Sequence, residues 1–75
     1  MFINLTIEFA VVKCDIRIDE EQKIGDGVKV LQERGLLPVG YIPDYFRSHV
    51  RQKLVSAYRT FREEEIYDGD ILTAL

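Results

Sequence analysis

The sequence is poor in the residue types from which most metal and redox sites are built. Its 75 residues contain one cysteine, Cys14, and one histidine, His49. A single cysteine cannot form an internal disulfide, a four-thiolate zinc site or a cysteine-ligated iron–sulfur cluster within one chain. We therefore expect no metal and no cofactor. A lone free cysteine also fits a reducing compartment, so we expect a cytoplasmic protein.

Long apolar runs and an excess of positive charge are also missing. No segment approaches the roughly 20 apolar residues that span a bilayer, and the opening residues 1–6 lack the basic region of a secretory signal. We expect no membrane insertion. The 13 acidic residues outnumber the 10 basic ones, which argues against a protein that neutralises many phosphates. Nucleic acid is not an expected partner.

The chain is long enough for one small domain, which we place at residues 1–75. A content of 47% hydrophobic and 31% charged residues is typical of a folded globular protein. A chain of this size buries only about 60% of the surface that its unfolded form exposes, so all elements must share one core. Little material remains for a deep cleft.

Two strands are predicted at the start of the chain. Residues 3–9 alternate between apolar and polar side chains, the pattern of a half-buried strand. A second alternation places Cys14, Ile16 and Ile18 on one face, with a short connection through residues 10–13. The two strands read as an antiparallel hairpin, in which Cys14 faces inward and behaves as a small hydrophobic residue.

A helix is predicted over about residues 22–34, because Ile24, Val28 and Leu31 recur at helical spacing. Gly25 and Gly27 lower the helix propensity, although a glycine also permits close approach of the sheet. Gly35 follows the predicted helix at the position where a residue in the left-handed conformation, usually glycine, commonly ends a helix. A loop then runs to residue 44, and we expect Leu36 and Tyr41 to anchor it.

The second half of the chain predicts three strands and one helical turn. Residues 46–51 alternate, which places Phe46, Ser48 and Val50 inward and Arg47, His49 and Arg51 outward; residues 54–55 supply a short fourth strand. Thr60 and Glu63 have the spacing of a capping box, so a helical turn should begin there. A fifth strand over residues 71–75 follows a turn at Asp68 and Gly69.

This order of elements is similar to that of the ubiquitin-like β-grasp, an α+β fold in which one helix packs across a mixed sheet of four to five strands. The segment Ile66-Tyr67-Asp68-Gly69-Asp70-Ile71-Leu72, with Leu75 at the end, resembles the ending of the YukD/EsaB group. That group consists of small bacterial ubiquitin-like proteins associated with type VII (WXG100) secretion. The resemblance implies a protein partner, and within that group the partner would be a component of the secretion machine.

The sequence departs from ubiquitin in two places. Ubiquitin and related sulfur carriers end in a flexible Gly-Gly that is activated for transfer, whereas this sequence ends at Leu75. We therefore expect a non-conjugating domain. The third strand carries Arg47, His49 and Arg51 in place of the apolar patch by which ubiquitin is recognised.

Two sets of residues are candidate partner-binding sites. One is the basic face of Arg47, His49 and Arg51, which suits an acidic partner. The other is an apolar patch expected on the outward face of the sheet, beside Thr6 and Thr73. Its members are Phe2, Ile71 and Leu75. Such a patch would suit either a protein partner or a homodimer.

No set of residues in the sequence predicts catalysis. His49 lacks converging partners, and no nucleophile with a base or glycine-rich phosphate loop is present. The leading hypothesis is a non-enzymatic ubiquitin-like interaction domain, with a bacterial type VII accessory protein as its sharper form. The alternatives are a small non-catalytic subunit of an oxygenase complex and, with less support, a covalent modifier or sulfur carrier.

Overall fold

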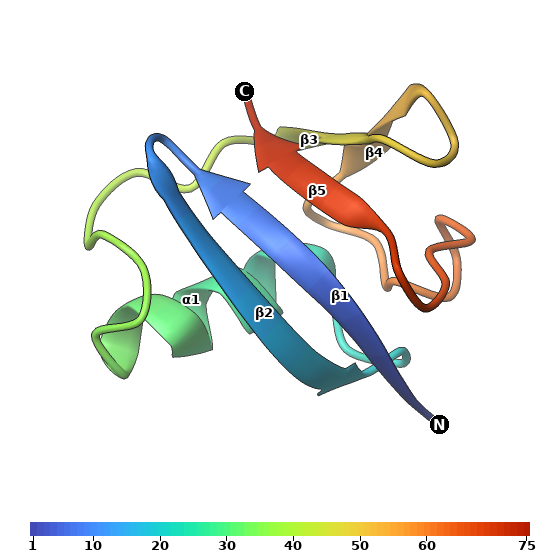
Figure 1. Cartoon of the computed structure of the whole chain (residues 1–75), viewed down its shortest axis with the longest axis horizontal. Helices are drawn as coiled ribbons and strands as arrows, with labels where there is room; N and C mark the ends of the chain where they lie inside the picture. Colours follow the sequence, from blue (N-terminus) through green and yellow to red (C-terminus); the bar gives the residue numbers. More distant parts are fainter.

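The chain forms a five-stranded mixed sheet with one helix across it (Figure 1). A computed structural model describes residues 1–75. The sheet order is β2-β1-β5-β3-β4, in which β1 and β5 are parallel and the other neighbours antiparallel. The elements are β1 (Phe2–Phe9), β2 (Val12–Asp19), α1 (Ile24–Glu33), β3 (Tyr45–Ser48), β4 (Lys53–Ser56) and β5 (Ile71–Ala74). The predicted α+β class and the mixed sheet are confirmed.

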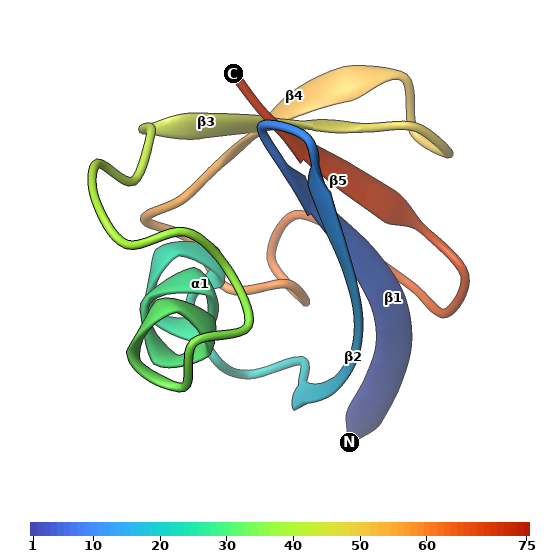
Figure 2. The same ribbon diagram turned by 60° about the vertical axis from the view of Figure 1, so that its left-hand side comes forward.

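The helix covers one face of the sheet and leaves the other face open (Figure 2). The alternation in β1 directs Ile3, Leu5 and Ile7 into the core, where they meet Val28 and Leu31 of α1. Strand β2 begins at Val12, earlier than predicted, because the hairpin turn needs only residues 10–11. Its inward residues, Cys14 among them, are only half-buried because β2 is an edge strand.

The first turn of α1 is held by the main chain that follows β4. The amides of Ile24 and Gly25 donate hydrogen bonds to the carbonyl oxygens of Arg59 and Ala57, at 2.9 and 2.8 Å. These bonds satisfy two of the amides that a helix start leaves without partners. They also bring the backbones so close that a Cβ atom at position 25 would lie 2.9 Å from the oxygen of Ala57. A glycine is therefore required at this position.

Alanine substitutions at the two helical glycines distinguish the effect of close backbone packing from the effect of helix propensity. A Cβ atom at position 27 would clash only with the tip of the Ile18 side chain, at 2.6 Å, which can rotate away, and it would make an ordinary contact with the Phe61 ring at 3.5 Å. We expect Gly25→Ala to lower the free energy of unfolding by about 1 to 3 kcal/mol. Gly27→Ala should be milder, because alanine gains about 1 kcal/mol in helix propensity. Urea unfolding measures both; the reverse ranking would contradict the proposed contact.

The helix ends as predicted at Gly35, but the loop after it is anchored by a different residue. Gly35 has φ +75°, and the amide of Leu36 donates to the carbonyl of Leu31 at 2.9 Å, which makes a Schellman motif. This turn directs Leu37 into the core. The expectation that Leu36 and Tyr41 anchor the loop is wrong: they are 50% and 77% exposed. The buried Gln32 amide instead holds the loop through the carbonyl of Pro38, at 2.9 Å.

Strand β3 is shorter than predicted, because the chain leaves the sheet after Ser48. His49, Val50 and Arg51 lie in the turn to β4, and Val50, expected to face inward, is 68% exposed. The cause is the carboxylate of Asp70, which accepts a hydrogen bond from the Val50 amide at 3.1 Å. The Ser48 hydroxyl oxygen accepts from the Arg51 amide at 3.1 Å, which closes the turn.

Asp70 joins three parts of the fold from a buried position. It is only 2% exposed, and its Oδ2 atom accepts a hydrogen bond from the Ser48 hydroxyl at 2.5 Å. Its Oδ1 atom accepts from its neighbour Ile71 at 2.7 Å, and its carbonyl accepts from the amide of Thr6 in β1 at 3.0 Å. One residue therefore connects β1, the start of β5 and the β3–β4 turn.

The residues before Asp70 extend the same strand pairing toward the start of β1. The amide of Gly69, where φ is +87°, donates to the carbonyl of Asn4 at 2.8 Å. The Asn4 amide donates to Oδ1 of Asp68 at 2.7 Å. The predicted turn is confirmed, and the carboxylates of Asp68 and Asp70 both accept hydrogen bonds from other parts of the chain. A positive φ explains the glycine between them.

Removing the Asp70 carboxylate should be among the most destabilising single changes. In Asp70→Ala, the Ser48 hydroxyl and the Val50 amide lose their acceptor, and hydrogen bonds to a charged group are worth roughly 1.5 to 3 kcal/mol each. We expect a loss of about 3 kcal/mol or more in the free energy of unfolding. Asp68→Ala, which removes one bond to an exposed carboxylate, serves as the control. Equal losses in the free energy of unfolding of Asp70→Ala and Asp68→Ala would contradict the larger contribution that we assign to the buried carboxylate.

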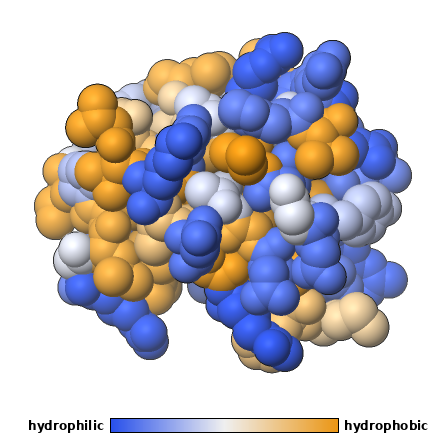
Figure 3. Space-filling model, viewed as in Figure 1, coloured by the Kyte–Doolittle hydropathy of each residue, from blue (hydrophilic) through white to orange (hydrophobic).

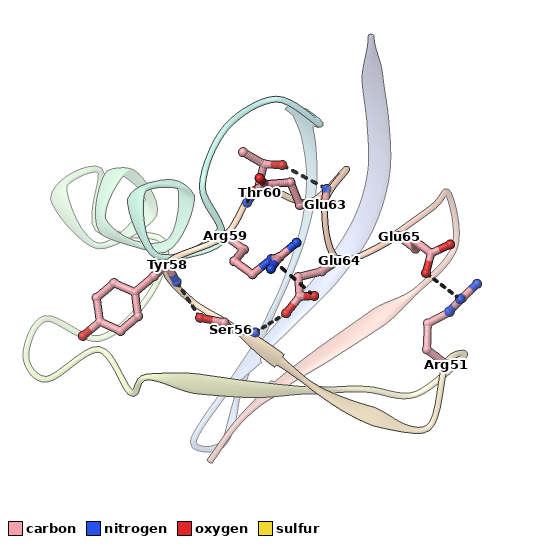
Figure 4. A network of polar contacts seen from close by, with 8 residues as sticks. All are labelled: Arg51, Ser56, Tyr58, Arg59, Thr60, Glu63, Glu64 and Glu65. Carbon is pink, nitrogen blue, oxygen red and sulfur yellow. Dashed lines mark hydrogen bonds and ion pairs between the residues drawn. The ribbon is translucent and has the colours of Figure 1, made fainter.

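The predicted capping box is confirmed, and the acidic residues after it all have partners (Figure 4). The Thr60 amide donates to Glu63 at 2.9 Å, and the Glu63 amide donates to the Thr60 hydroxyl at 3.0 Å. The Thr60 amide is also the main cause that lowers the pKa of Glu63. Glu64 accepts from the Ser56 amide at 2.6 Å, and Glu65 accepts from Arg51 at 3.2 Å.

Candidate interaction surface

The open face of the sheet carries a row of outward side chains that crosses all five strands. The pairing register sets Lys13 beside Glu8, Glu8 beside Thr73, Thr73 beside Arg47, and Arg47 beside Leu54. These residues come from β2, β1, β5, β3 and β4 in that spatial order. Side chains directly opposite each other on neighbouring strands are close enough to interact.

Hydrogen bonds connect four side chains of this face. The carboxylate of Glu8 contacts the Lys13 ammonium at 3.2 Å and accepts from the Thr73 hydroxyl at 2.8 Å. A hydroxyl has one hydrogen, so the Thr73 oxygen must accept from Nε2–H of His49, 2.7 Å away. The chain of contacts fixes His49 against the sheet with Nε2 protonated. The Thr73 hydroxyl and then Lys13 are the main causes that lower the pKa of Glu8.

Arg47 lies beside this chain of contacts and takes part in none of the five ion pairs of the protein. Its neighbours on the same face are two apolar side chains about half exposed, Tyr45 in β3 and Leu54 in β4. Leu75, two residues beyond Thr73, extends this apolar surface at the end of β5 and is 64% exposed. We call Tyr45, Arg47, His49, Leu54 and Leu75 the open-face patch.

Arg51 does not join Arg47 and His49. It lies in the β3–β4 turn, where its guanidinium contacts Glu65 at 3.2 Å (Figure 4). The guanidinium also stands 6.0 Å from the centre of the Tyr67 ring. Arg59 and Arg62 are also paired, with Glu64 and Glu21. The structure therefore brings together only Arg47 and His49 of the predicted basic face.

The three apolar residues predicted as one patch are spread along the sheet. Ile71 lies opposite Thr6 in the parallel register, so Phe2 is four residues before this point and Leu75 is four residues after it. At about 3.3 Å per residue, Phe2 and Leu75 stand roughly 26 Å apart. Ile71 is half-buried, and the exposed Phe2 ring contacts Arg17, whose Cζ atom lies 5.6 Å from the ring centre. Only Leu75 belongs to the open-face patch.

Four important residues of this face were not among the predicted site residues: Glu8, Thr73, Tyr45 and Leu54. Alternation in the sequence does place Glu8 outward. The contact between Glu8 and Thr73 depends on the register of two strands 65 positions apart, which no local pattern encodes. Tyr45 stands just before the predicted start of the strand, so the alternation of residues 46–51 does not assign it to a face.

Two classes of feature are not found among residues 1–75. No group of three or more His, Cys, Asp and Glu side chains is placed to hold a metal ion. The single helix is too short and too polar for a membrane-crossing segment.

Comparisons with known proteins identify the fold. No protein-family model matches the chain, and no curated protein does. Among solved structures, the ubiquitin-like domain of an Arabidopsis thaliana protein has a TM-score of 0.69 and 12% identity, covering 99% of this chain and 76% of that one. The EccD5 ubiquitin-like domain from Mycobacterium xenopi gives 0.58 and 22%, covering 100% and 93%. Caldiarchaeum subterraneum ubiquitin gives 0.61 and 16%, covering 100% and 95%.

The chain therefore has the ubiquitin-like β-grasp fold, as the order of its elements predicted. Identities of 12% to 22% establish this fold and no narrower relationship. Ubiquitin-like domains generally act as non-catalytic modules in protein interactions. The open-face patch is the place where this chain offers exposed apolar side chains around an unpaired arginine.

The Glu8 contacts predict a measurable pKa change. Because folding lowers the Glu8 pKa, this carboxylate contributes stability above its unfolded value of 4.5, and the contribution is lost as the pH falls through the folded pKa. We expect Thr73→Val to raise the pKa of Glu8 toward that value, as followed by carboxyl NMR titration. Thr6→Val, which removes a contact to Asp15, should leave the Glu8 pKa unchanged. An unaltered Glu8 pKa in Thr73→Val would contradict the assigned hydrogen bond.

Proposed function

We propose that this chain is a ubiquitin-like interaction domain that docks non-covalently on a protein partner through the open-face patch and carries out no chemistry. The observation that carries the proposal is Arg47, an unpaired cation between the exposed apolar residues Tyr45 and Leu54. Arginine and tyrosine are enriched among the residues that dominate binding energy at protein interfaces. An exposed acidic side chain of the partner, beside an apolar one, would match this arrangement.

The partner that we propose is a component of a bacterial type VII secretion system. The resemblance of residues 66–72 to the YukD/EsaB ending supports this choice. The fold likeness to a mycobacterial ubiquitin-like domain, that of EccD5, is compatible with a bacterial setting. A subunit of an oxygenase complex and a covalent modifier or sulfur carrier are the competing functions, and they differ in what remains bound to the chain.

A pull-down from the native host tests both the surface and the mode of binding. Tagged wild type, Arg47→Glu and Arg51→Glu serve as baits, and each sample is washed natively in one half and under denaturing conditions in the other. Arg47→Glu and Arg51→Glu change the net charge equally, but Arg51 already contacts Glu65 outside the patch. We expect mass spectrometry to find a partner that Arg47→Glu retains at least about tenfold less than the other two baits, since charge reversal replaces attraction by repulsion.

The other outcomes select among the alternatives. Adducts that survive the denaturing wash would show covalent attachment and would support a modifier or carrier in place of a docking domain. A co-purifying di-iron subunit would indicate the oxygenase complex. Equal loss of the partner from Arg47→Glu and Arg51→Glu would show that overall charge, and not the open-face patch, governs binding.

A further inference from the structure

Strand β2 leaves its outer backbone edge without a partner strand; the only contact there is a long one, 3.9 Å, from the Cys14 thiol to the carbonyl of Asp15. In β1, the Thr6 amide donates to the carbonyl of Asp70, and the Asn4 carbonyl accepts from the amide of Gly69. The backbone N–H and C=O groups of the even-numbered β1 residues therefore point toward β5, and those of the odd-numbered residues point toward β2. The register then directs the backbone groups of Lys13, Asp15 and Arg17 away from the sheet. An exposed edge of this kind is a template for another strand.

The side chains at the same positions alternate in charge. Lys13, Asp15, Arg17 and Asp19 lie on the open face of β2 and read positive, negative, positive, negative. If a second β2 strand runs antiparallel with Ile16 on the two-fold axis, Lys13 faces Asp19 and Asp15 faces Arg17. The symmetry repeats each contact, so all four cross-strand pairs join opposite charges. Such pairs stabilise antiparallel strands, and like charges directly opposite destabilise them.

Neighbouring registers lack this complementarity. With Asp15 on the axis, the two copies of Asp15 face each other and Lys13 faces Arg17 of the second copy. With Arg17 on the axis, it faces itself and Asp15 faces Asp19. With Cys14 on the axis, Lys13 and Asp15 form the only opposite-charge pairs. The sequence of β2 therefore selects the Ile16 register over the alternatives.

The inward side of β2 is apolar and incompletely covered. Ile16 and Ile18 are half-buried and line a groove of about 290 Å³ between β2 and α1, in which Val30 is 37% exposed. In the Ile16 register, Ile16 faces its own copy and Cys14 faces Ile18. The space-filling view shows hydrophobic residues gathered on the left, on the side of the molecule where β2 and the segment after α1 lie (Figure 3).

We propose that two copies of this chain associate through their β2 edges, antiparallel and with Ile16 on the two-fold axis. The product is a continuous ten-stranded sheet with both α1 helices on the same side. Strands β3 and β4 lie at the opposite edge of each sheet, so the open-face patch of each copy stays free. The dimer would present two such patches, which raises the avidity for a partner that carries two matching sites.

A charge swap tests the proposal, with sedimentation velocity over a concentration series as the measurement. Arg17→Asp sets the new aspartate opposite Asp15 of the second copy, and Asp15→Arg sets the new arginine opposite Arg17. We expect each single change to raise the dimer Kd at least about tenfold, because two attractive pairs become repulsive. The double change Asp15→Arg/Arg17→Asp restores opposite charges and should return the Kd to within about threefold of wild type.

A cysteine placed on the axis tests the register. Directly opposite residues that do not share hydrogen bonds have Cα atoms about 4.5 Å apart, within the range of disulfides. We expect Cys14→Ser/Ile16→Cys to form a disulfide-linked dimer under mild oxidation. Wild type should not, because Cys14 faces Ile18. Circular dichroism verifies that every variant is folded.

Three results would overturn the proposal. The first is a wild type that stays monomeric over the whole concentration series. The second is a folded double swap that fails to recover dimerisation, since a different partner strand would not be restored by changing both positions on this chain. The third is ready cross-linking of wild type through Cys14, which would place Cys14 on the axis. None of these outcomes tests the open-face patch, so the proposed function is judged separately.

Discussion

The buried carboxylate of Asp70 is the interaction on which the rest of the sheet depends. Strands β1 and β5 are parallel neighbours from opposite ends of the chain, and they need a fixed register. Asp70 supplies it through its carbonyl bond to Thr6, and its side chain meanwhile holds Ser48 and Val50. A buried charge is tolerable only when hydrogen bonds surround it, and here three donors do so. Local turn chemistry thus determines long-range pairing.

The arrangement of the open face follows from that register. With Thr6 beside Ile71, the next outward pair is Glu8 and Thr73, and β3 then brings Arg47 beside Thr73. The turn that Asp70 closes also positions His49 over Thr73. Glu8, Thr73 and His49 satisfy one another, which leaves Arg47 beside them without a carboxylate partner. Its availability is a consequence of how its neighbours are paired.

Local patterns in the sequence predicted most of the elements and few of the contacts. Alternation identified β1 and β2, and Gly35 and the Thr60–Glu63 spacing marked a helix end and a turn, because each feature is determined by adjacent residues. The end of β3 depends on Asp70, about twenty positions later, and extrapolated alternation carried the strand too far. The three apolar residues predicted as one patch do not lie together for the same reason: the β1–β5 register, which local patterns do not encode, separates Phe2 from Leu75.

The two edges of the sheet differ in how well they are protected. Strand β4 has only four residues, and the carboxylate of Glu64 takes the Ser56 amide, so part of this edge is already occupied. Short strands and covered amides are common ways in which proteins prevent unwanted strand pairing. Strand β2 has eight residues, and charged side chains are its only such protection. Charges of alternating sign repel most registers but favour the one in which they are complementary, so the same four side chains that discourage general aggregation also specify a single antiparallel pairing.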